Sequence, residues 1–285
     1  MKKSVIVLLA VLLFLSACAT EPEFTRQTFP RIDGSTATKP ISDAIAARFL
    51  SMKPDEASRF VRHNTTHQAY VNLVEGRADI IFVSEPSKDE IAMAGAKGIT
   101  FETTPVAVDA FVFITAKDNP VQSLTVAQIR DIYTGRIANW KDVGGEDMLI
   151  VAFQREPNSG SQTIMQNVVM KGLIMMKPPT ERVAEDMGGI IDMVAEYKDT
   201  RDSLGYTIYY FVREMHQNMN IKLLGVNGVV PSTQTIRNKS YVFAGPVLAV
   251  TRKGDVPGNA RALLSWMLSD AGQKLIVETG FVAVR

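Results

Sequence analysis

The chain of 285 residues is poor in the side chains that build covalent and metal frameworks, because it has one cysteine and three histidines. A single cysteine excludes an internal disulfide framework. The formal net charge is only +1, so the sequence predicts no basic face and no nucleic-acid partner. After the N-terminus no apolar run reaches the length of a membrane-spanning helix. The remaining composition, with 46% hydrophobic and 21% charged residues, is typical of a folded globular protein.

The N-terminus has the pattern of an export signal. Two lysines precede an apolar run over 5–15, which is too short to span a bilayer comfortably. The run ends in Leu-Ser-Ala-Cys, with Cys18 at the expected cleavage point, and this resembles the lipobox of bacterial lipoproteins. We therefore expect a signal peptide at 1–17, lipidation of Cys18 and a polar tether at 18–30. A plain signal peptide with a chance cysteine is the alternative.

Strand-like and helix-like segments alternate along the rest of the chain, which favours an α/β fold. The expected strands are 29–32, 58–62, 79–83, 106–115, 149–153, 221–226 and 246–252. The expected helices are 37–52, 66–75, 88–97, 125–133, 162–171, 189–197 and 260–279, while 206–212 is ambiguous. The apolar strands at 108–115 and 246–252 are a possible pair that crosses between two lobes. One continuous doubly wound domain is the alternative, and periodicity does not choose between them.

The segment Arg155-Glu156-Pro157-Asn158-Ser159-Gly160-Ser161 follows a predicted strand and opens a helical pattern. Free backbone N–H groups and the macrodipole make the start of a helix attractive to an anion. Glycine lets the backbone approach the anion, hydroxyls add donors, and arginine supplies a planar fork for two oxygens. Taken alone, the segment fits an ordinary helix cap with a surface arginine equally well.

Two more hydroxyl-rich junctions join a predicted strand to a helix. They are Asp33-Gly34-Ser35-Thr36-Ala37 and Asn64-Thr65-Thr66-His67. In α/β sheets such turns lie at the carboxyl ends of strands, where ligands bind. Together with the arginine segment, they predict a site for one small anion.

An acidic turn, Ser84-Glu85-Pro86-Ser87, follows the expected strand at 79–83. A carboxylate repels an anion, unless the anion carries a proton that the carboxylate can accept in a hydrogen bond. Glu85 would then accept from a P–OH group and reject a fully deprotonated anion such as sulfate. The alternative is a surface glutamate that stabilises the start of the helix at 88–97.

These motifs resemble the phosphate-binding lipoproteins of the bacterial high-affinity phosphate ABC transporter, from about Ile32 to the C-terminus. The most specific match is Arg-x-x-x-Ser-Gly-Ser/Thr. The resemblance implies that the phosphate-binding residues are Ser35, Thr36, Ala37, Thr66, Glu85, Arg155, Ser159, Gly160 and Ser161. In the second loop Thr65 is the alternative to Thr66. The family often has aspartate where this chain has Glu85.

The resemblance also implies a two-lobed type II periplasmic binding protein with a ligand cleft between its lobes. Lobe 1 would comprise 31–113 and 247–285, and lobe 2 would comprise 114–246. The expected function is capture of inorganic phosphate by a monomer, without cofactor or metal and without enzymatic activity. A lipid on Cys18 would hold the protein on the extracytoplasmic face of a membrane, and a permease and ATPase complex would receive the phosphate.

Two other functions are alternatives. The same fold could serve sensing, adhesion or the binding of another oxyanion, such as arsenate. A phosphate-ester hydrolase is the second, because His63 and His67 are four residues apart and could share a helix face as zinc ligands do. Against this, no third ligand has a recognisable spacing and the sequence has no Gly-x-Ser-x-Gly elbow.

Overall fold

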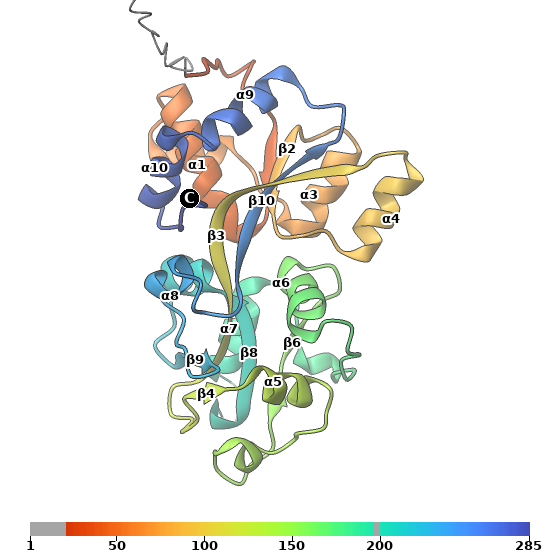
Figure 1. Cartoon of the computed structure of the whole chain (residues 1–285), viewed down its shortest axis with the longest axis vertical. Coiled ribbons are helices and arrows are strands. Elements are labelled where there is room, and N and C mark those ends of the chain that lie inside the picture. The colour runs from red at the N-terminus through yellow and green to blue at the C-terminus, as the bar shows by residue number, and fades with distance from the viewer. Residues whose placement is uncertain (1–20, 197–199) are drawn as a thin grey trace, which may run out of the picture.

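The computed structural model describes residues 21–196 and 200–285. Figure 1 shows two halves of mixed helix and sheet, one above the other, joined by the long strands β3 and β10. The expected α/β, two-lobed architecture is confirmed. The expected signal peptide and Cys18 lie outside the described residues. Within the described ranges, no helix is both long enough and apolar enough to cross a membrane.

The two halves are called the upper and lower lobes, after Figure 1. The upper lobe contains β1 (Ile32–Gly34), η1 (Thr36–Thr38), α1 (Lys39–Leu50), α2 (Pro54–Phe60), α3 (Thr65–Val74), β2 (Ile80–Val83), α4 (Lys88–Ala96), α9 (Gly258–Met267) and α10 (Asp270–Glu278). The lower lobe contains β4 (Ser123–Leu124), α5 (Val126–Tyr133), η2 (Trp140–Val143), β5 (Val151–Ala152), β6 (Gln154–Arg155), α6 (Gly160–Ile164), η3 (Met165–Met170), η4 (Thr180–Arg182), β7 (Val183–Ala184), α7 (Met187–Glu196), η5 (Thr200–Asp202), β8 (Ser203–Ile208), η6 (Phe211–Met215), β9 (Ile221–Val226) and α8 (Thr233–Arg237).

The strands β3 (Phe101–Ala116) and β10 (Ala244–Arg252) run through both lobes. They pair antiparallel from Phe101 to Ala110, which confirms the expected pair. Beyond Ala110, β3 pairs with β8 and β9 of the lower lobe. On its other edge β10 pairs with β2 of the upper lobe, at Leu248 to Val250. The main sheet has the order β1-β2-β10-β3-β8-β5. The register between β10 and β3 shifts between Val247 and Leu248.

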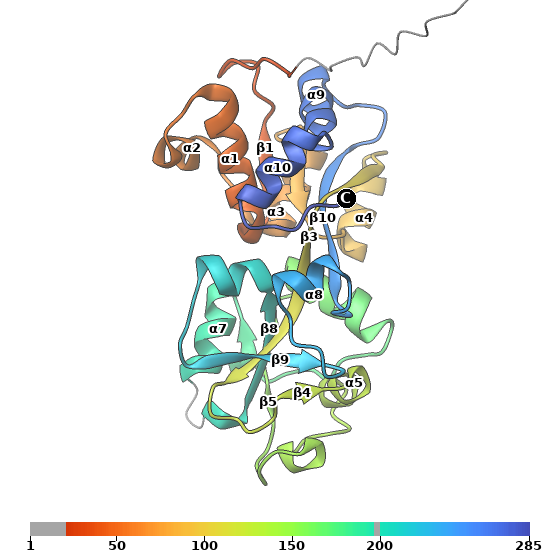
Figure 2. The same cartoon turned by 60° about the vertical axis from the view of Figure 1, so that its left-hand side comes forward.

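Each lobe buries its own apolar core. The upper core lies between α1, β2 and α9, with Ile41, Ile45 and Phe82 fully buried. The lower core contains large rings that are likewise withdrawn from water, among them Trp140 and Tyr206. Figure 2 shows that helices flank the strands of both lobes. Separate cores allow each lobe to behave as a unit, with the two strands as connection.

Some expected elements are wrong. The segment 58–62 is not a strand, because α2 (Pro54–Phe60) occupies it, with proline in the first turn and Asp55 and Glu56 beside the positive helix end. The expected long helix at 260–279 is divided into α9 and α10. Ser269 starts α10 by accepting a hydrogen bond from the backbone N–H of Gly272.

Three other expected segments differ in part from the structure. The helix expected at 162–171 begins at Gly160 and widens into the π-helical stretch η3 from Met165. The ambiguous segment 206–212 is the end of β8 followed by the start of η6. Part of the expected tether contacts the upper lobe, because the ring of Phe24 packs edge-on against Phe49 of α1.

Candidate anion-binding site

The first predicted loop, between β1 and α1, is held by a hydrogen bond to β2 and by a contact within the loop. The N–H of Ser35 donates to the carbonyl of Phe82 (3.0 Å), and the hydroxyls of Ser35 and Thr38 lie 3.1 Å apart. A Cβ atom on Gly34 would stand 2.5 Å from that same carbonyl, so only glycine lets β1 approach β2 here. Thr36 is exposed and Ala37 is buried.

The buried carboxylate of Asp33 ties the first loop to the second. It accepts hydrogen bonds from the backbone N–H of Gly34 (2.7 Å) and from the backbone N–H (2.8 Å) and side-chain amide (2.9 Å) of Asn64. Asn72 of α3 also donates to it (2.6 Å). These bonds fix the start of α3, where Thr65 has a left-handed φ of 68° and Thr66 is buried.

The third predicted segment opens α6 in the lower lobe. The hydroxyl of Ser159 caps the helix by accepting from the N–H of Gln162 (3.2 Å). Gly160 then meets the upper lobe: a Cβ atom on it would stand 2.5 Å from Thr66 Oγ1 and 3.0 Å from Ser84 Oγ. The start of α6 therefore faces the start of α3 and the turn after β2 across the boundary between lobes.

Arg155 lies just behind this contact, buried in the lower lobe. Its guanidinium donates to the carbonyls of Ala184 (3.1 Å) and Glu185 (3.2 Å) and to the hydroxyl of Ser161 (3.3 Å). All three partners are neutral, and a guanidinium has more N–H donors than these bonds use. Burial lowers the pKa of Arg155, yet the group stays charged because its ordinary value is so high.

Tyr206 of β8 fixes the backbone of Arg155 in place. Its hydroxyl accepts from the N–H of Arg155 (3.0 Å) and donates to the side chain of Gln162 in α6. Burial raises the pKa of Tyr206 well above its ordinary value, so the phenol keeps its proton. The fork of Arg155 and the start of α6 are thus held in one geometry before any ligand arrives.

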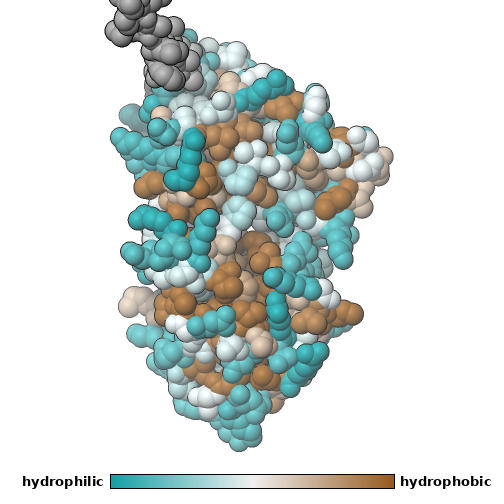
Figure 3. Space-filling model, in the orientation of Figure 1, coloured by the Kyte–Doolittle hydropathy of each residue, from teal (hydrophilic) through white to brown (hydrophobic). Residues whose placement is uncertain are grey.

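Glu85 lines both a groove and a smaller cavity. An open groove of about 1100 Å³ is lined by Glu85, Arg155 and Thr163. A smaller cavity of about 110 Å³ is lined by Ala37, Ser84, Glu85 and Thr163, among others. In Figure 3, apolar side chains gather around the middle of the visible face, where the two lobes meet. Glu85 and Arg155 therefore line the same groove, and Glu85 directly follows Ser84, whose hydroxyl lies close to Gly160.

The structure gathers most of the predicted residues. Arg155, Ser161 and Gly160 form one cluster with Thr66, and Ala37 and Glu85 line the adjoining cavity. Within the described residues the hydroxyl of Thr36 makes no hydrogen bond to the cluster, and the hydroxyl of Ser35 contacts that of Thr38 in its own loop. Residues that sequence reasoning did not assign are Asp33, Thr38, Ser84, Thr163 and Tyr206. Ser84 and Thr163 adjoin predicted motifs. Tyr206, in contrast, contacts the backbone of Arg155, which lies more than fifty positions away in the sequence.

His63 and His67 do not share a helix face, as the zinc alternative expected. His63 precedes α3 and contacts the carbonyl of Ser35 (2.7 Å) and the hydroxyl of Ser42 (2.9 Å), and burial lowers its pKa. His67 contacts Glu90 (3.0 Å). Within residues 21–196 and 200–285, no group of three or more histidine, cysteine or acidic side chains is arranged to hold a metal ion.

Known proteins resemble this chain over most of its length. PstS of Borreliella burgdorferi, a phosphate-binding protein, is 25% identical over 261 residues, which is 89% of each chain. PstS of Bacillus subtilis (strain 168) is 25% identical over 257 residues, covering 89% of this chain and 80% of its own.

Solved structures agree with these relatives. A Clostridium perfringens protein, named as a phosphate ABC transporter substrate-binding protein and solved with bound phosphate, has a TM-score of 0.69 and 29% identity. The match covers 89% of this chain and 98% of that one. The family model of the PBP superfamily domain matches residues 19–271. The protein therefore belongs to the periplasmic binding protein (PBP) superfamily.

Proposed function

We propose that this protein is an extracytoplasmic phosphate-binding subunit that delivers inorganic phosphate to an ABC transporter. The observation that carries the proposal is the burial and hydrogen bonding of the Arg155 guanidinium. Its buried guanidinium has neutral partners only and lies beside the start of α6. The carboxylates of Asp186 and Glu156 act on this cation electrostatically, but no hydrogen bond joins either of them to it. A buried cation that is hydrogen-bonded to neutral groups only is costly, so the arrangement favours an anion as a further partner. The names of the relatives as phosphate-binding proteins support phosphate as that anion.

Phosphate would be held by donors from both lobes. Arg155 offers a planar fork, and the first N–H groups of α6 point toward the lobe boundary. Thr66 and Ser84 add hydroxyls from the opposite side. Glu85 accepts a hydrogen bond from a P–OH group, which sulfate lacks, and this gives selectivity. Ser35, Thr36, Ala37, Ser159 and Ser161 complete the proposed phosphate-binding set.

Closure around the ligand would be a hinge movement at the two long strands. The units that move are 31–113 with 247–285 and 114–246. Support comes from the pairing of β3 with both sheets and from the register shift between Val247 and Leu248. Hinge closure at a few strand positions is a common response to ligand in two-lobed proteins.

The remaining parts of the proposal concern the cellular setting. A lipid on Cys18 anchors a monomer to the outer face of a membrane, and a permease and ATPase complex receives the phosphate. The protein binds and releases its ligand without turnover, so a generic phosphomonoester should be hydrolysed no faster than in buffer. The name of the similar Clostridium perfringens protein supports an ABC transporter as partner.

The test is calorimetric titration of inorganic phosphate into Arg155→Met and into the matched control Arg136→Met, whose arginine is exposed and pairs with Asp131. Loss of a charge-assisted bidentate contact should weaken binding by about a hundredfold, or roughly 3 kcal/mol. The control should bind like the unmodified chain. Equal phosphate affinity in all three proteins would remove Arg155 from the site.

A further inference from the structure

A second groove lies beside the strands that join the lobes, and Arg155 does not line it. We call it the hinge groove, and it has a volume of about 790 Å³. Its walls come from β3 and β10, from α8 and the segment after it, and from α10 with the C-terminal segment 282–285. Figure 1 and Figure 2 both show the C-terminus just above α8. The hinge groove therefore touches both lobes.

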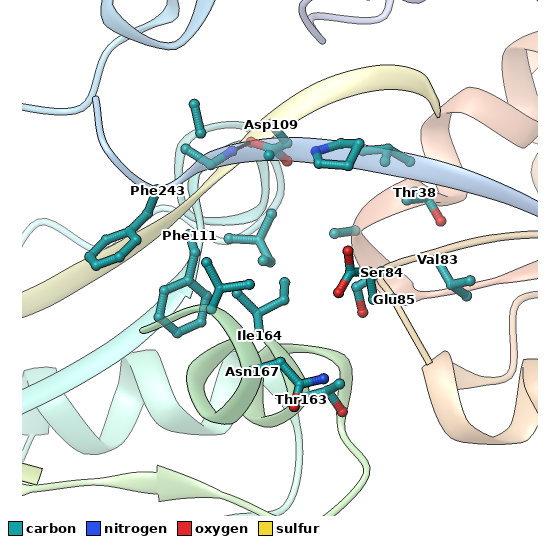
Figure 4. A pocket seen from close by; sticks show the side chains of 18 residues that line it. Thr38, Val83, Ser84, Glu85, Asp109, Phe111, Thr163, Ile164, Asn167 and Phe243 are labelled. Carbon is teal, nitrogen blue, oxygen red and sulfur yellow. Dashed lines mark hydrogen bonds between the residues drawn. The ribbon is translucent and has the colours of Figure 1, made fainter. Parts of the chain in front are cut away.

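The hinge groove is separate from the anion site. Val108 of β3 lines the hinge groove, whereas the next residue, Asp109, lines the smaller cavity together with Glu85. Figure 4 shows the side chains of Asp109 and Glu85 in that cavity. Successive side chains of a strand point to opposite faces, so β3 stands between the two hollows, although 244–246 of β10 line both. A ligand in the hinge groove would leave the donors proposed for phosphate free.

Apolar side chains form most of the walls of the hinge groove. Ile236 and Val282 are buried in its floor, while Val242 of the lower lobe and Val277 of α10 remain 49% and 47% exposed. Single exposed apolar residues are normal on a protein surface, but a contiguous apolar hollow marks an interaction site. The walls therefore suit an apolar ligand.

The charged side chains around the hinge groove are all positive. Arg237 of α8, Lys239 and Arg285 line it, and no acidic side chain does so among the described residues. Within the part of the chain that the structure describes, none of these three side chains forms an ion pair or a hydrogen bond. Even with the α-carboxyl group of Arg285 counted, the lining residues carry more positive than negative charge. An anionic group on the ligand would balance it.

The backbone along the hinge groove is already paired. The N–H of Val108 donates to the carbonyl of Val282 (2.7 Å), and the N–H of Val282 donates to the carbonyl of Val108 (3.1 Å). A peptide that binds as an added strand needs a free strand edge, which this wall does not offer. An alkyl chain needs no such partner, because burial of its methylene groups stabilises the complex.

We propose that the hinge groove binds a long-chain carboxylate, such as a fatty acid anion. Its alkyl chain lies along the apolar walls, and its carboxylate pairs with the exposed cations Arg237, Lys239 and Arg285. If each carbon atom takes about 30 Å³, the share of a water molecule in the liquid, a chain of twelve carbons fills less than half of the roughly 790 Å³ available.

The experiment is calorimetric titration of the chain with dodecanoate, butanoate and dodecyltrimethylammonium, at concentrations at which none of them forms micelles. Butanoate has the same head group and a short chain, whereas the ammonium compound has the same chain and a positive head group. We expect one site for dodecanoate, at least about a hundredfold tighter than for butanoate, because each buried methylene group strengthens binding by roughly fourfold. The affinity for the ammonium compound should be at least about tenfold lower than that for dodecanoate.

A pair of matched variants locates the site. Val277→Glu places a carboxylate on the apolar wall and should weaken dodecanoate binding at least about tenfold. Ile91→Glu in α4 is the control, because Ile91 is 55% exposed and does not line the hinge groove. It should bind dodecanoate like the unmodified chain. Thermal unfolding at similar temperatures in all three proteins checks that both variants fold.

A second pair of variants tests the head group. The double variant Arg237→Gln, Lys239→Gln keeps one cation of the three, so its preference for dodecanoate over the ammonium compound should fall about three- to tenfold. The control is Arg136→Gln, Lys274→Gln, which removes two exposed cations that do not line the hinge groove. It should keep the preference of the unmodified chain.

Several results would overturn the inference. One is equal affinity for dodecanoate and the ammonium compound, and another is dodecanoate binding in Val277→Glu that equals that of Ile91→Glu. A third is a dimer in light scattering that is lost in Val277→Glu, without any dodecanoate binding, because a second copy of the chain would then occupy the hinge groove. Titration of inorganic phosphate answers the proposed function separately, since neither ligand requires the other.

Discussion

Gly160 of the lower lobe and Thr66 of the upper lobe touch so closely that a Cβ atom on Gly160 would stand 2.5 Å from Thr66 Oγ1. Real Cβ atoms do not approach other atoms this closely. The contact joins two helix starts that are far apart in sequence. The glycine of the Ser-Gly-Ser motif is therefore needed for the approach of the lobes as well as for access of an anion to the backbone.

Gly160→Ala should prevent this approach and weaken phosphate binding by about tenfold or more, roughly 1.4 kcal/mol. The added methyl group meets Thr66 and Ser84, so the lobes would close incompletely around the ligand. Gly95→Ala in α4 is the control, because a Cβ atom there meets nothing within 4 Å. Calorimetric titration of phosphate compares them, and an unchanged affinity in Gly160→Ala would refute the closed arrangement.

Glu85→Gln should reduce the discrimination between phosphate and sulfate. An amide can donate a hydrogen bond to an unprotonated oxygen, whereas the carboxylate can only accept one. The affinity for sulfate should rise by about tenfold, the scale of one charged hydrogen bond. Competition titrations with both anions measure the ratio, and Glu102→Gln on the exposed part of β3 serves as control. An affinity ratio equal to that of the unmodified chain would show that Glu85 does not select for a protonated ligand oxygen.

Asn158→Gly should speed the release of phosphate. The amide of Asn158 in the lower lobe donates to Asp89 of α4 in the upper lobe (3.0 Å), and so holds the lobes together at the rim of the groove. Glycine tolerates the φ of 64° at this position, so the change removes the hydrogen bond without backbone strain. The dissociation rate, measured by stopped flow with a fluorescent label, should rise about three- to tenfold for an exposed bond. A rate that does not change would mean that this contact is not part of closure.

Asp109→Asn should alter how stability depends on pH. The folded pKa of Asp109 is about 7, against about 3.9 in an unfolded chain. Between these values the folded state keeps a proton that the unfolded state has lost, so stability falls as the pH rises from about 4 to about 7. Each unit of pKa difference is worth about 1.4 kcal/mol, so this fall amounts to a few kcal/mol.

Urea unfolding of the ligand-free chain at about pH 5 and about pH 8 measures this fall. The variant should lose less stability between the two pH values than the unmodified chain. Asp142→Asn, which changes an exposed carboxylate of η2, should lose as much as the unmodified chain does. Identical pH dependence in Asp109→Asn and the unmodified chain would contradict a protonated Asp109 in the folded state.

Local chemistry made the site motifs predictable from the sequence. Glycine, hydroxyl residues and arginine at the start of a helix leave a pattern within a few positions, and Arg155, Gly160 and Ser161 indeed lie together. The paired apolar strands were predictable for a similar reason, because long apolar runs are conspicuous. The fold class followed from these strands and from the alternation of helix and strand.

Contacts between distant positions were not predictable. Asp33 binds Asn64 and Asn72, and Tyr206 binds Arg155, with partners thirty to fifty positions away and no spacing that marks them. The strand expected at 58–62 was wrong, although Pro54 with acidic neighbours signals a helix start. The break between α9 and α10 depends on one capping serine, Ser269. It was missed because the helical spacing of apolar residues continues across the break.

A crystal structure of the chain grown with inorganic phosphate tests the central proposal most directly. We expect one phosphate between Arg155 and the starts of α6 and α3, within hydrogen-bond distance of the Arg155 guanidinium, the N–H groups of Gly160 and Ser161, and Glu85. Phosphate bound elsewhere, or a closed site without phosphate at saturating concentration, would contradict the assignment of this boundary between the lobes as the ligand site.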